Sequence, residues 1–322
     1  MSTRNKAAIF GFSGASLSEK EHRFFAEHNP LGFILFARNI ENPTQVKKLT
    51  NELRELSGNP NVPILIDQEG GRVARLKPPH FRESPPAGIF FALAKRDIEK
   101  AKMAVYMNSC LMAHELFSLG INVNCAPVAD ILFPGAHDII GDRAFGDTPE
   151  MVAALAAEVC RGFQDCGIIP VVKHIPGHGR AKSDSHHHLP MVEAPLETLE
   201  MTDFEAFRRL NKMPWAMTAH ITYIAIDEKN PATLSQKVID VIRKNIGFEG
   251  LLLTDDISMK ALSGSFAERS EKSFAAGCDV ILHCNGKNGR DGGDCSPRST
   301  AFRRCDEEAH IREKIPAISK TA

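Results

Sequence analysis

The sequence predicts an α/β fold, a single-domain (β/α)8 TIM barrel, on three observations. Short apolar runs alternate with longer amphipathic stretches along most of the chain. There are eight such runs, the number of strands in a closed barrel of this type. Each run is almost uninterrupted by polar residues, as expected for parallel strands that are covered on both faces. A doubly wound sheet with further strands is the alternative that this pattern leaves open.

The predicted strands are short and rich in Val, Ile and Leu. They cover residues 8–11, 32–36, 63–67, 122–126, 169–173, 215–219, 251–254 and 279–283. Segments with a helical pattern lie between them, at residues 18–28, 44–56, 97–119, 149–166 and 236–245. Ser18 with Glu21 three positions later indicates a capping box. Pro149 suits the first turn of its helix, and Gly247 suits the position after a helix end.

The last part of the chain does not fit this alternation. We expect residues 1–287 to form the barrel domain and residues 288–322 to form an anomalous, weakly structured tail. The tail is rich in Gly, Arg and Asp and has few large apolar residues. A barrel needs an eighth helix here, and residues 299–314 offer only a weak one.

The composition and charge of the chain argue against a membrane protein and against a nucleic-acid-binding protein. The chain is 43% hydrophobic and 25% charged, with a formal net charge of −1, as in ordinary soluble proteins. This charge favours neither nucleic acid nor an anionic membrane as a partner. The longest apolar runs are shorter than the roughly 20 residues of a membrane span, and the N-terminus lacks a signal-peptide core. We therefore expect a cytoplasmic protein. We also expect a monomer. The eight cysteines contain no C-x-x-C pair and are interpreted as buried thiols.

Polar residues gather where four predicted strands end. The third strand runs into IDQEGGR at 66–72 and the fifth into KHIPGHG at 173–179, while the sixth is followed by His220 and the seventh by Asp255 and Asp256. In a barrel these ends meet at one mouth, where active sites lie. Burying a charged residue at the end of a strand costs free energy unless a partner or a ligand there compensates the charge. The sequence therefore predicts a polar site at the mouth.

Each of these residues also has a structural interpretation. Asp67 could cap a helix or bind loop amides, and Glu69 could hold its loop rather than contact a substrate. His220 could be a structural histidine. Asp256 is best interpreted as the N-cap of a helix at 257–262, which leaves Asp255 as the carboxylate that faces the mouth.

The loop at 177–190, GHGRAKSDSHHHLP, carries a candidate acid–base pair. A histidine two residues from an aspartate can donate a hydrogen bond to it, which orients the ring and favours its protonated form. Asp184 and His186 have this spacing. A solvated polar loop is the alternative. Three consecutive histidines also suggest a metal, but successive side chains alternate in direction and rarely bind one ion together.

Together these motifs resemble those of family 3 glycoside hydrolases. The matching segments are IDQEGGRV at 66–73, KHIPGHG at 173–179, DSH at 184–186 and TDDISM at 254–259. The resemblance extends over about residues 7–287, and the motifs are specific in combination. The K-H-x-P-G-H-G loop followed by D-S-H is typical of the hexosaminidase branch, the cytoplasmic β-N-acetylglucosaminidases of bacterial peptidoglycan recycling.

The resemblance implies a retaining exo-β-N-acetylglucosaminidase. Asp255 matches the nucleophile that forms a covalent glycosyl–aspartate, and His186 matches the acid/base with Asp184 as its partner. The substrate-binding positions match Asp67, Arg75, Arg143, Lys173 and His174. The implied substrate is GlcNAc linked to 1,6-anhydro-N-acetylmuramic acid, with or without its peptide. No cofactor and no metal are implied.

Two other functions compete with this one. A metal-dependent barrel hydrolase would place an H-x-H pair at the end of the first strand, where this chain has GFSG at 11–14. A non-catalytic sugar-binding barrel would not need the full set of Asp255, His186 and Asp184. The departure from the family pattern is the tail after about residue 288, where a helical C-terminus is expected.

Overall fold

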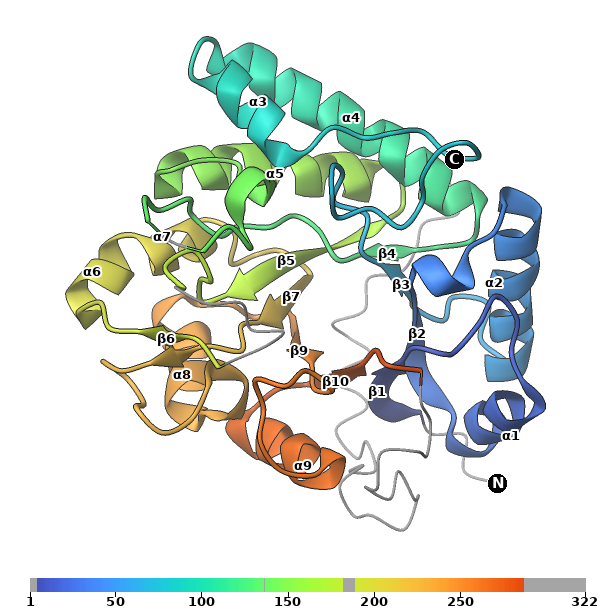
Figure 1. Cartoon of the computed structure of the whole chain (residues 1–322). Helices are drawn as coiled ribbons and strands as arrows, with labels where there is room; N and C mark the ends of the chain where they lie inside the picture. Colours follow the sequence, from blue (N-terminus) through green and yellow to red (C-terminus); the bar gives the residue numbers. More distant parts are fainter. Residues whose placement is uncertain (1–4, 136, 182–188, 287–322) are drawn as a thin grey trace.

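A closed parallel barrel of eight strands forms the centre of the protein, as the sequence predicts (Figure 1). The computed structural model describes residues 5–135, 137–181 and 189–286. The strands are β1 (Lys6–Phe10), β2 (Pro30–Leu35), β3 (Ile64–Ile66), β4 (Val123–Asn124), β5 (Ile169–Ile175), β7 (Trp215–Thr218), β9 (Leu251–Asp256) and β10 (Val280–His283). Their order around the barrel is β1-β10-β9-β7-β5-β4-β3-β2.

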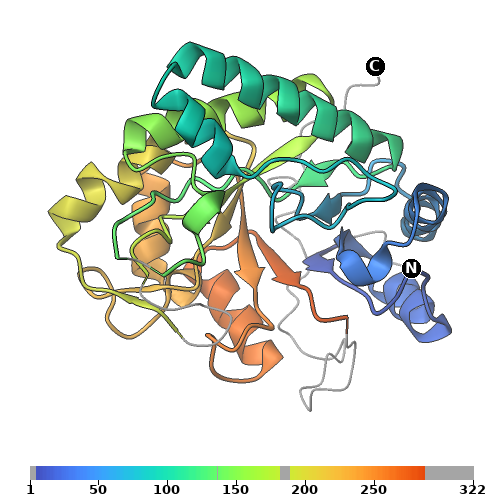
Figure 2. The ribbon, with the colours of Figure 1, turned by 45° about the horizontal axis from the view of Figure 1, so that its top comes forward.

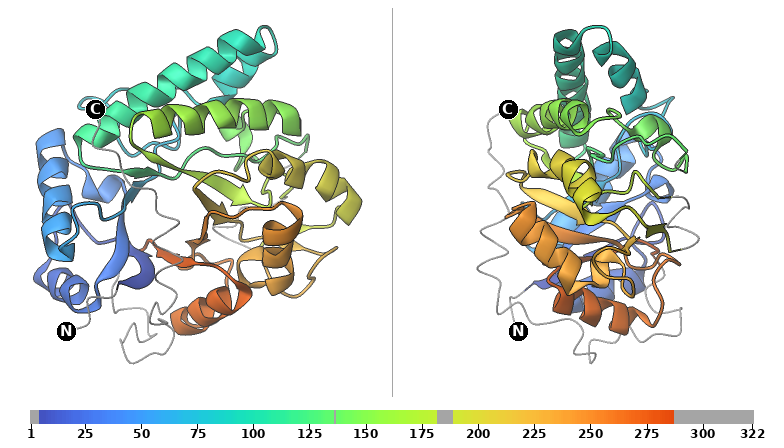
Figure 3. Two further views of the ribbon diagram at one scale, coloured as in Figure 1. Left: turned by 180° about the vertical axis from the view of Figure 1, so that it is seen from behind. Right: turned by 90° about the vertical axis from the view of Figure 1, so that its left-hand side faces the viewer.

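Helices surround the barrel on the outside (Figures 2 and 3). They are α1 (Glu19–His28), α2 (Pro43–Ser57), α3 (Ala87–Ala94), α4 (Ile98–Ser118), α5 (Pro149–Asp165), α6 (Leu196–Met201), α7 (Asp203–Arg208), α8 (Gln236–Asp240) and α9 (Phe266–Ala276). The helices α3 and α4 lie outermost and pack on α5. In the described ranges, no helix combines the length and the hydrophobicity that crossing a membrane requires.

Shorter pieces connect these elements. The 3-10 turns are η1 (Ala37–Asn39), η2 (Gly141–Arg143) and η3 (Ala232–Leu234), and a π-helical turn, η4, covers Val241–Asn245. The strands β6 (Met191–Val192) and β8 (Thr222–Tyr223) pair in parallel outside the barrel. The turn η2 matters for the site because it carries Arg143.

Local sequence signals explain several boundaries. Ser18 caps α1 in a capping box with Glu21, as predicted: the Glu21 N–H donates to Ser18 Oγ at 3.3 Å, and the Ser18 N–H donates to Glu21 Oε2 at 2.9 Å. Pro149 is the first residue of α5. The predicted helix at 236–245 is instead α8 followed by the π-helical η4. The helix predicted at 257–262 is wrong, because turns follow β9 there.

The core has two layers. Inside the barrel, side chains such as Ile9, Leu65, Val171 and Trp215 are completely buried and pack on one another. A larger apolar layer fills the space between the strands and the helices, with Phe25 among its largest members. Each such side chain contributes about 1.5–3 kcal/mol on burial. The barrel interior is therefore solid below the mouth, which gives the polar residues above it a rigid base.

Candidate active site

A cavity of about 300 Å³ opens at the mouth of the barrel. Its wall is formed by Ile34, Phe36, Asp67, Glu69, Arg72, Val73, Arg75, Ile139, Arg143, Lys173, His174, His178, Met217, Asp255, Asp256, Met259, Leu282 and Cys284. Six predicted site residues are in this wall: Asp67, Arg75, Arg143, Lys173, His174 and Asp255. The other two, Asp184 and His186, lie outside the described residues.

Lys173 is the central cation of the cavity wall. It comes from β5, and its Nζ lies 2.9 Å from Asp67 Oδ1 and 2.8 Å from Glu69 Oε1. Its side chain is 3% exposed, so the ammonium needs these two carboxylates to remain charged. Burial opposes the charge, but Asp67 and Glu69 outweigh it and raise the pKa of Lys173 above its usual value. The amine is therefore a permanent hydrogen-bond donor at this wall.

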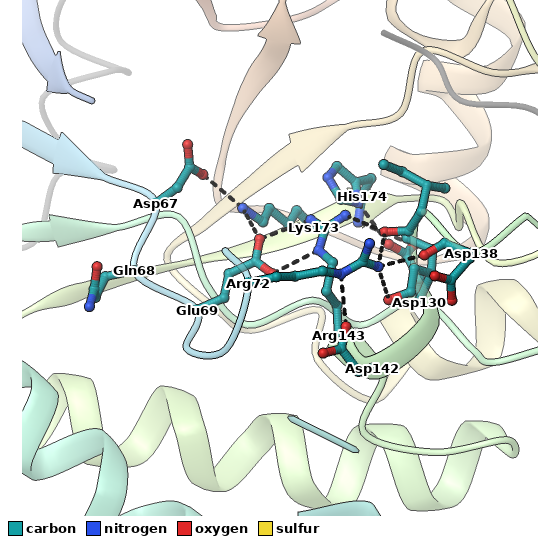
Figure 4. Close-up of polar contacts among 12 residues, drawn as sticks. Asp67, Gln68, Glu69, Arg72, Asp130, Asp138, Asp142, Arg143, Lys173 and His174 are labelled. Atoms are coloured by element: carbon teal, nitrogen blue, oxygen red, sulfur yellow. Dashed lines mark hydrogen bonds and ion pairs between the residues drawn. The ribbon is translucent and has the colours of Figure 1, made fainter. Parts of the chain in front are cut away.

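Asp67 follows β3 and forms ion pairs with two basic side chains. Its Oδ2 lies 3.2 Å from Arg75 Nη2, in addition to the contact with Lys173. Burial opposes ionisation of Asp67, but the charges of Lys173 and Arg75 together hold its pKa below the usual value. The predicted alternative of a helix cap does not apply, because Asp67 is part of an ion-pair network in the cavity wall (Figure 4).

Arg143 reaches the cavity from the loop after β4. Its Nη1 donates to the carbonyl of Ile139 at 2.9 Å. Arg72 fastens the same loop from the side of β3: its Nε lies 2.8 Å from Asp142 Oδ1, and its Nη2 donates to the carbonyls of Asp138 and Ile139 at 2.5 and 3.0 Å. The loop that carries Arg143 is thus tied to the neighbouring strand end (Figure 4).

His174 contacts a fully buried acid, Asp130, which is not part of the cavity wall. Asp130 Oδ2 lies 2.7 Å from His174 Nδ1, and Asp130 Oδ1 accepts the backbone N–H groups of His178 at 2.6 Å and of His174 at 3.3 Å. Burial opposes ionisation of Asp130, but the nearby His174 and these hydrogen bonds lower its pKa. Burial, with a smaller effect of His174, lowers the pKa of His178 to about 4.

The two acids at the end of β9 have separate roles. Asp256 accepts the N–H groups of Ser258 and Cys284 at 2.9 and 3.0 Å, and the Ser258 hydroxyl donates to it at 2.6 Å. It therefore ties β9 to the end of β10. Asp255 accepts the N–H of Asp256 at 2.7 Å through Oδ1, which fixes the rotation of its carboxylate at the cavity wall.

A buried chain of hydrogen bonds lies behind Asp255. The Asp255 N–H donates to Thr218 Oγ1 at 3.4 Å, and Thr218 Oγ1 lies 2.8 Å from Thr233 Oγ1. His220 Nδ1 lies 2.8 Å from the same Thr233 oxygen, and His220 Nε2 lies 3.0 Å from the carbonyl of Asp256. His220 is therefore a structural histidine that supports the end of β9, one of the two interpretations that the sequence left open.

Several contacts at this site were not predicted. The sequence left the role of Glu69 open, and Glu69 in fact pairs with Lys173 and Arg143. Asp130 was not singled out, although it is the first charged residue after the uncharged stretch at 121–129, a signal that could have identified it. In the ranges that the structure describes, no group of three or more His, Cys, Asp or Glu side chains is arranged to hold a metal ion.

Comparison with known proteins places the chain among glycoside hydrolases. Residues 3–290 match the glycosyl hydrolase family 3 N-terminal domain. A beta-hexosaminidase of Alkalilimnicola ehrlichii is 39% identical over 282 residues, which cover 86% of this chain and 80% of the relative. NagZ from Neisseria gonorrhoeae, solved in complex with N-trifluoroacetyl-D-glucosamine, has a TM-score of 0.81 and 33% identity, covering 88% of this chain and 82% of that chain.

A second solved structure has a longer chain. The family 3 β-N-acetylglucosaminidase from a Paenibacillus species has a TM-score of 0.80 and is 36% identical to this chain. The match covers 86% of this chain and 53% of the Paenibacillus chain. The shared part includes the barrel that carries the cavity described above.

Proposed function

We propose, because the chain belongs to glycosyl hydrolase family 3, that it is a retaining exo-β-N-acetylglucosaminidase with Asp255 as its nucleophile. The chain is a glycoside hydrolase that acts on β-N-acetylglucosaminides, in keeping with its beta-hexosaminidase relatives. One observation carries the proposal for this chain: Asp255 lies in the same cavity wall as Asp67, Lys173 and His174. A sugar held by those polar groups would meet a carboxylate at the end of β9.

The proposed reaction has two steps. A carboxylate oxygen of Asp255 attacks the anomeric carbon, while His186 gives its proton to the glycosidic oxygen and the aglycone leaves. His186 then takes a proton from water, the water oxygen attacks the anomeric carbon, and the bond to Asp255 breaks. Histidine suits both steps because its usual pKa, ~6.5, lies near neutrality. Asp184 would orient the ring of His186 and stabilise its protonated form.

The hydrogen bonds of Asp256 support the covalent route. In a substrate-assisted mechanism two acids would act together on the acetamido group of the substrate. Asp256 instead accepts hydrogen bonds from Ser258 and Cys284, which leaves Asp255 as the acid suited to attack. Both acids belong to the cavity wall, so it is these hydrogen bonds that distinguish Asp256 from Asp255.

The proposed natural substrate is GlcNAc linked to 1,6-anhydro-N-acetylmuramic acid, with or without its peptide, in a cytoplasmic pathway of cell-wall recycling. Asp67, Lys173, Arg143 and His174 would bind the hydroxyl groups of GlcNAc. Arg72 and Arg75 also belong to the cavity wall, and guanidinium groups suit a carboxylate such as that of the muramyl lactyl group.

The test is turnover by the purified protein. We expect hydrolysis of 4-nitrophenyl N-acetyl-β-D-glucosaminide in the presence of EDTA, and much weaker hydrolysis of the 4-nitrophenyl β-glucoside, which lacks the acetamido group. The Asp255→Ala variant should lose the activity and keep the fold. Binding of the sugar without turnover would instead identify a sugar-binding protein. Turnover that EDTA abolishes would identify a metal-dependent hydrolase.

A further inference from the structure

Asp130 is a buried acid that the proposed reaction does not use directly. It is fully buried, it is not part of the cavity wall, and it contacts His174, which is part of that wall. The Nδ1 edge of the His174 ring therefore faces the protein interior. The opposite edge, with Nε2, is the one that a substrate in the cavity can reach.

We propose that Asp130 is a positioning residue that holds the ring proton of His174 on Nδ1, so that Nε2 accepts a hydrogen bond from a sugar hydroxyl. This inference rests on the proposed function, since it assumes a sugar in the cavity. A carboxylate can only accept hydrogen bonds, so His174 Nδ1 must be the donor in the 2.7 Å contact. In the neutral ring the other nitrogen then has a lone pair and no proton.

The geometry around Asp130 leaves it one way to bind the ring. Its Oδ1 already accepts the backbone N–H groups of His178 and His174, at 2.6 and 3.3 Å. Its Oδ2 is therefore the oxygen that faces the ring.

The Asp130→Asn variant reverses the polarity of this contact. The amide oxygen of the new side chain can still accept the two backbone N–H groups. The amide NH2 then faces Nδ1, and because NH2 is a donor, Nδ1 must become an acceptor and the ring proton must move to Nε2. Rotating the amide by 180° would set its NH2 against two backbone N–H donors and is disfavoured. His174 would thus offer the sugar a donor in place of an acceptor.

The first measurement is the ¹⁵N spectrum of the histidine side chains near neutral pH, which distinguishes protonated from unprotonated ring nitrogens. The His174→Gln variant assigns the signal among the 13 histidines. We expect protonated Nδ1 and unprotonated Nε2 in the wild-type protein and the reverse in Asp130→Asn. A wild-type ring protonated on Nε2, or on both nitrogens, would overturn the proposal. This measurement needs no turnover, so the wild-type spectrum can overturn the proposal even if the proposed function fails or the variant does not fold.

The second measurement uses 4-nitrophenyl GlcNAc substrates in which fluorine replaces the 3-, 4- or 6-hydroxyl. Fluorine cannot donate a hydrogen bond, so wild-type enzyme should discriminate against the analogue altered at the hydroxyl that His174 binds. The Asp130→Asn variant should lose about 100-fold in kcat/KM on the parent substrate, and its discrimination against that one analogue should fall at least about tenfold. The inductive effect of fluorine is the same in both enzymes and cancels in this comparison.

A matched control is Asp279→Asn. Asp279 is a partly buried acid that, like Asp130, has a charged or ionisable side-chain partner and a backbone partner, here Arg243 and the N–H of Leu252. It lies before β10 at the opposite end of the barrel. This variant should keep the wild-type discrimination among the fluorinated substrates. If Asp130→Asn lowers kcat/KM for the parent and all three analogues by one common factor, Asp130 has only a general structural role and the proposal is wrong.

Discussion

Arg143 and Glu69 form a bidentate ion pair in the cavity wall, with Nε 2.8 Å from Oε2 and Nη2 2.9 Å from Oε1. Both side chains are at most 10% exposed. Burial opposes the charge of Glu69, but Arg143 and Lys173 outweigh it and lower its pKa far below the usual value. Glu69 therefore stays ionised near neutral pH, where it is the shared counter-charge of Arg143 and Lys173.

Replacing Glu69 with Ala leaves Arg143 and Lys173 short of a buried counter-charge. We expect the free energy of unfolding, measured in urea, to fall by about 3 kcal/mol. Asp142→Ala is the control, because the Arg72–Asp142 pair is more than two-fifths exposed on both sides, and such pairs contribute about 0–1 kcal/mol. Equal losses in the two variants would contradict the importance of the Glu69 ion pairs.

His178 should make stability depend on pH. Its pKa in the folded protein is about 4, against ~6.5 in the unfolded chain. Between these values the unfolded chain binds a proton that the folded protein does not. The free energy of unfolding therefore falls as the pH falls from 6.5 to 4, by about 3 kcal/mol from this group. Urea titrations across this window should show that His178→Asn removes this part of the slope. A variant with the wild-type slope would rule out His178 as its source.

Thr233→Val should weaken the chain of hydrogen bonds that lies behind Asp255. The change keeps the shape but removes the oxygen that Thr218 and His220 both contact. We expect a loss of about 2 kcal/mol in stability and a lower kcat with KM nearly unchanged. Thr222→Val is the matched control, since among the described residues the buried Thr222 hydroxyl has no hydrogen-bond partner. That variant should be at least as stable as the wild type; a larger loss than in Thr233→Val would be evidence against the role of Thr233.

His186→Ala should discriminate between leaving groups. A poor leaving group needs a proton from the acid, and 4-nitrophenolate does not. We expect kcat/KM to fall about 100-fold more for 4-methoxyphenyl or disaccharide substrates than for the 4-nitrophenyl glycoside. Asp184→Ala should have the same kind of effect, but weaker. His187→Ala, in the same stretch of sequence, serves as the control. Equal losses for good and poor leaving groups would argue against proton donation by His186.

The covalent intermediate should be trapped on Asp255. Incubation with a 5-fluoro glycosyl fluoride of GlcNAc should add one sugar mass, and peptide mapping should place it within residues 251–260. The Asp255→Asn variant, which keeps the size of the side chain, should remain unlabelled. Absence of an adduct in an enzyme that turns over substrate, together with inhibition by a thiazoline analogue, would instead support attack by the substrate's own acetamido group.

The barrel was predictable because its strands are read from one simple signal. Buried parallel strands are apolar on both faces, so each appears as a short continuous run whatever surrounds it. Capping signals are also local: Ser18 with Glu21 was recognised, and Ser265 with Glu268 is a second capping box, at the start of α9, that could have been used in the same way. The π-helical turn after α8 has no such signal, because the helical pattern continues through it.

A site residue could be placed from the sequence where its position near the end of one predicted strand was enough to locate it. Asp67 directly follows a buried strand, and Lys173 and Asp255 lie in the last three residues of theirs, so the barrel geometry alone brings them to the mouth. Partnerships between loops were not predictable. The contact of Asp130 with His174 joins the loop after β4 to the end of β5. Thr218 looks like an ordinary strand residue in the sequence, and its part in the support of Asp255 depends on Thr233 from a later loop.

The ion pairs of Lys173 and Arg143 also affect the entropy of binding. A mobile lysine or arginine side chain loses up to about 2 kcal/mol of rotamer freedom when it becomes ordered. Here both are ordered by Glu69 before a ligand arrives, so the cost falls on folding and not on association. A ligand as small as one sugar has little surface with which to offset such a loss. The acids of the wall thus immobilise these long, charged side chains during folding, so that a sugar bound beside them would not have to.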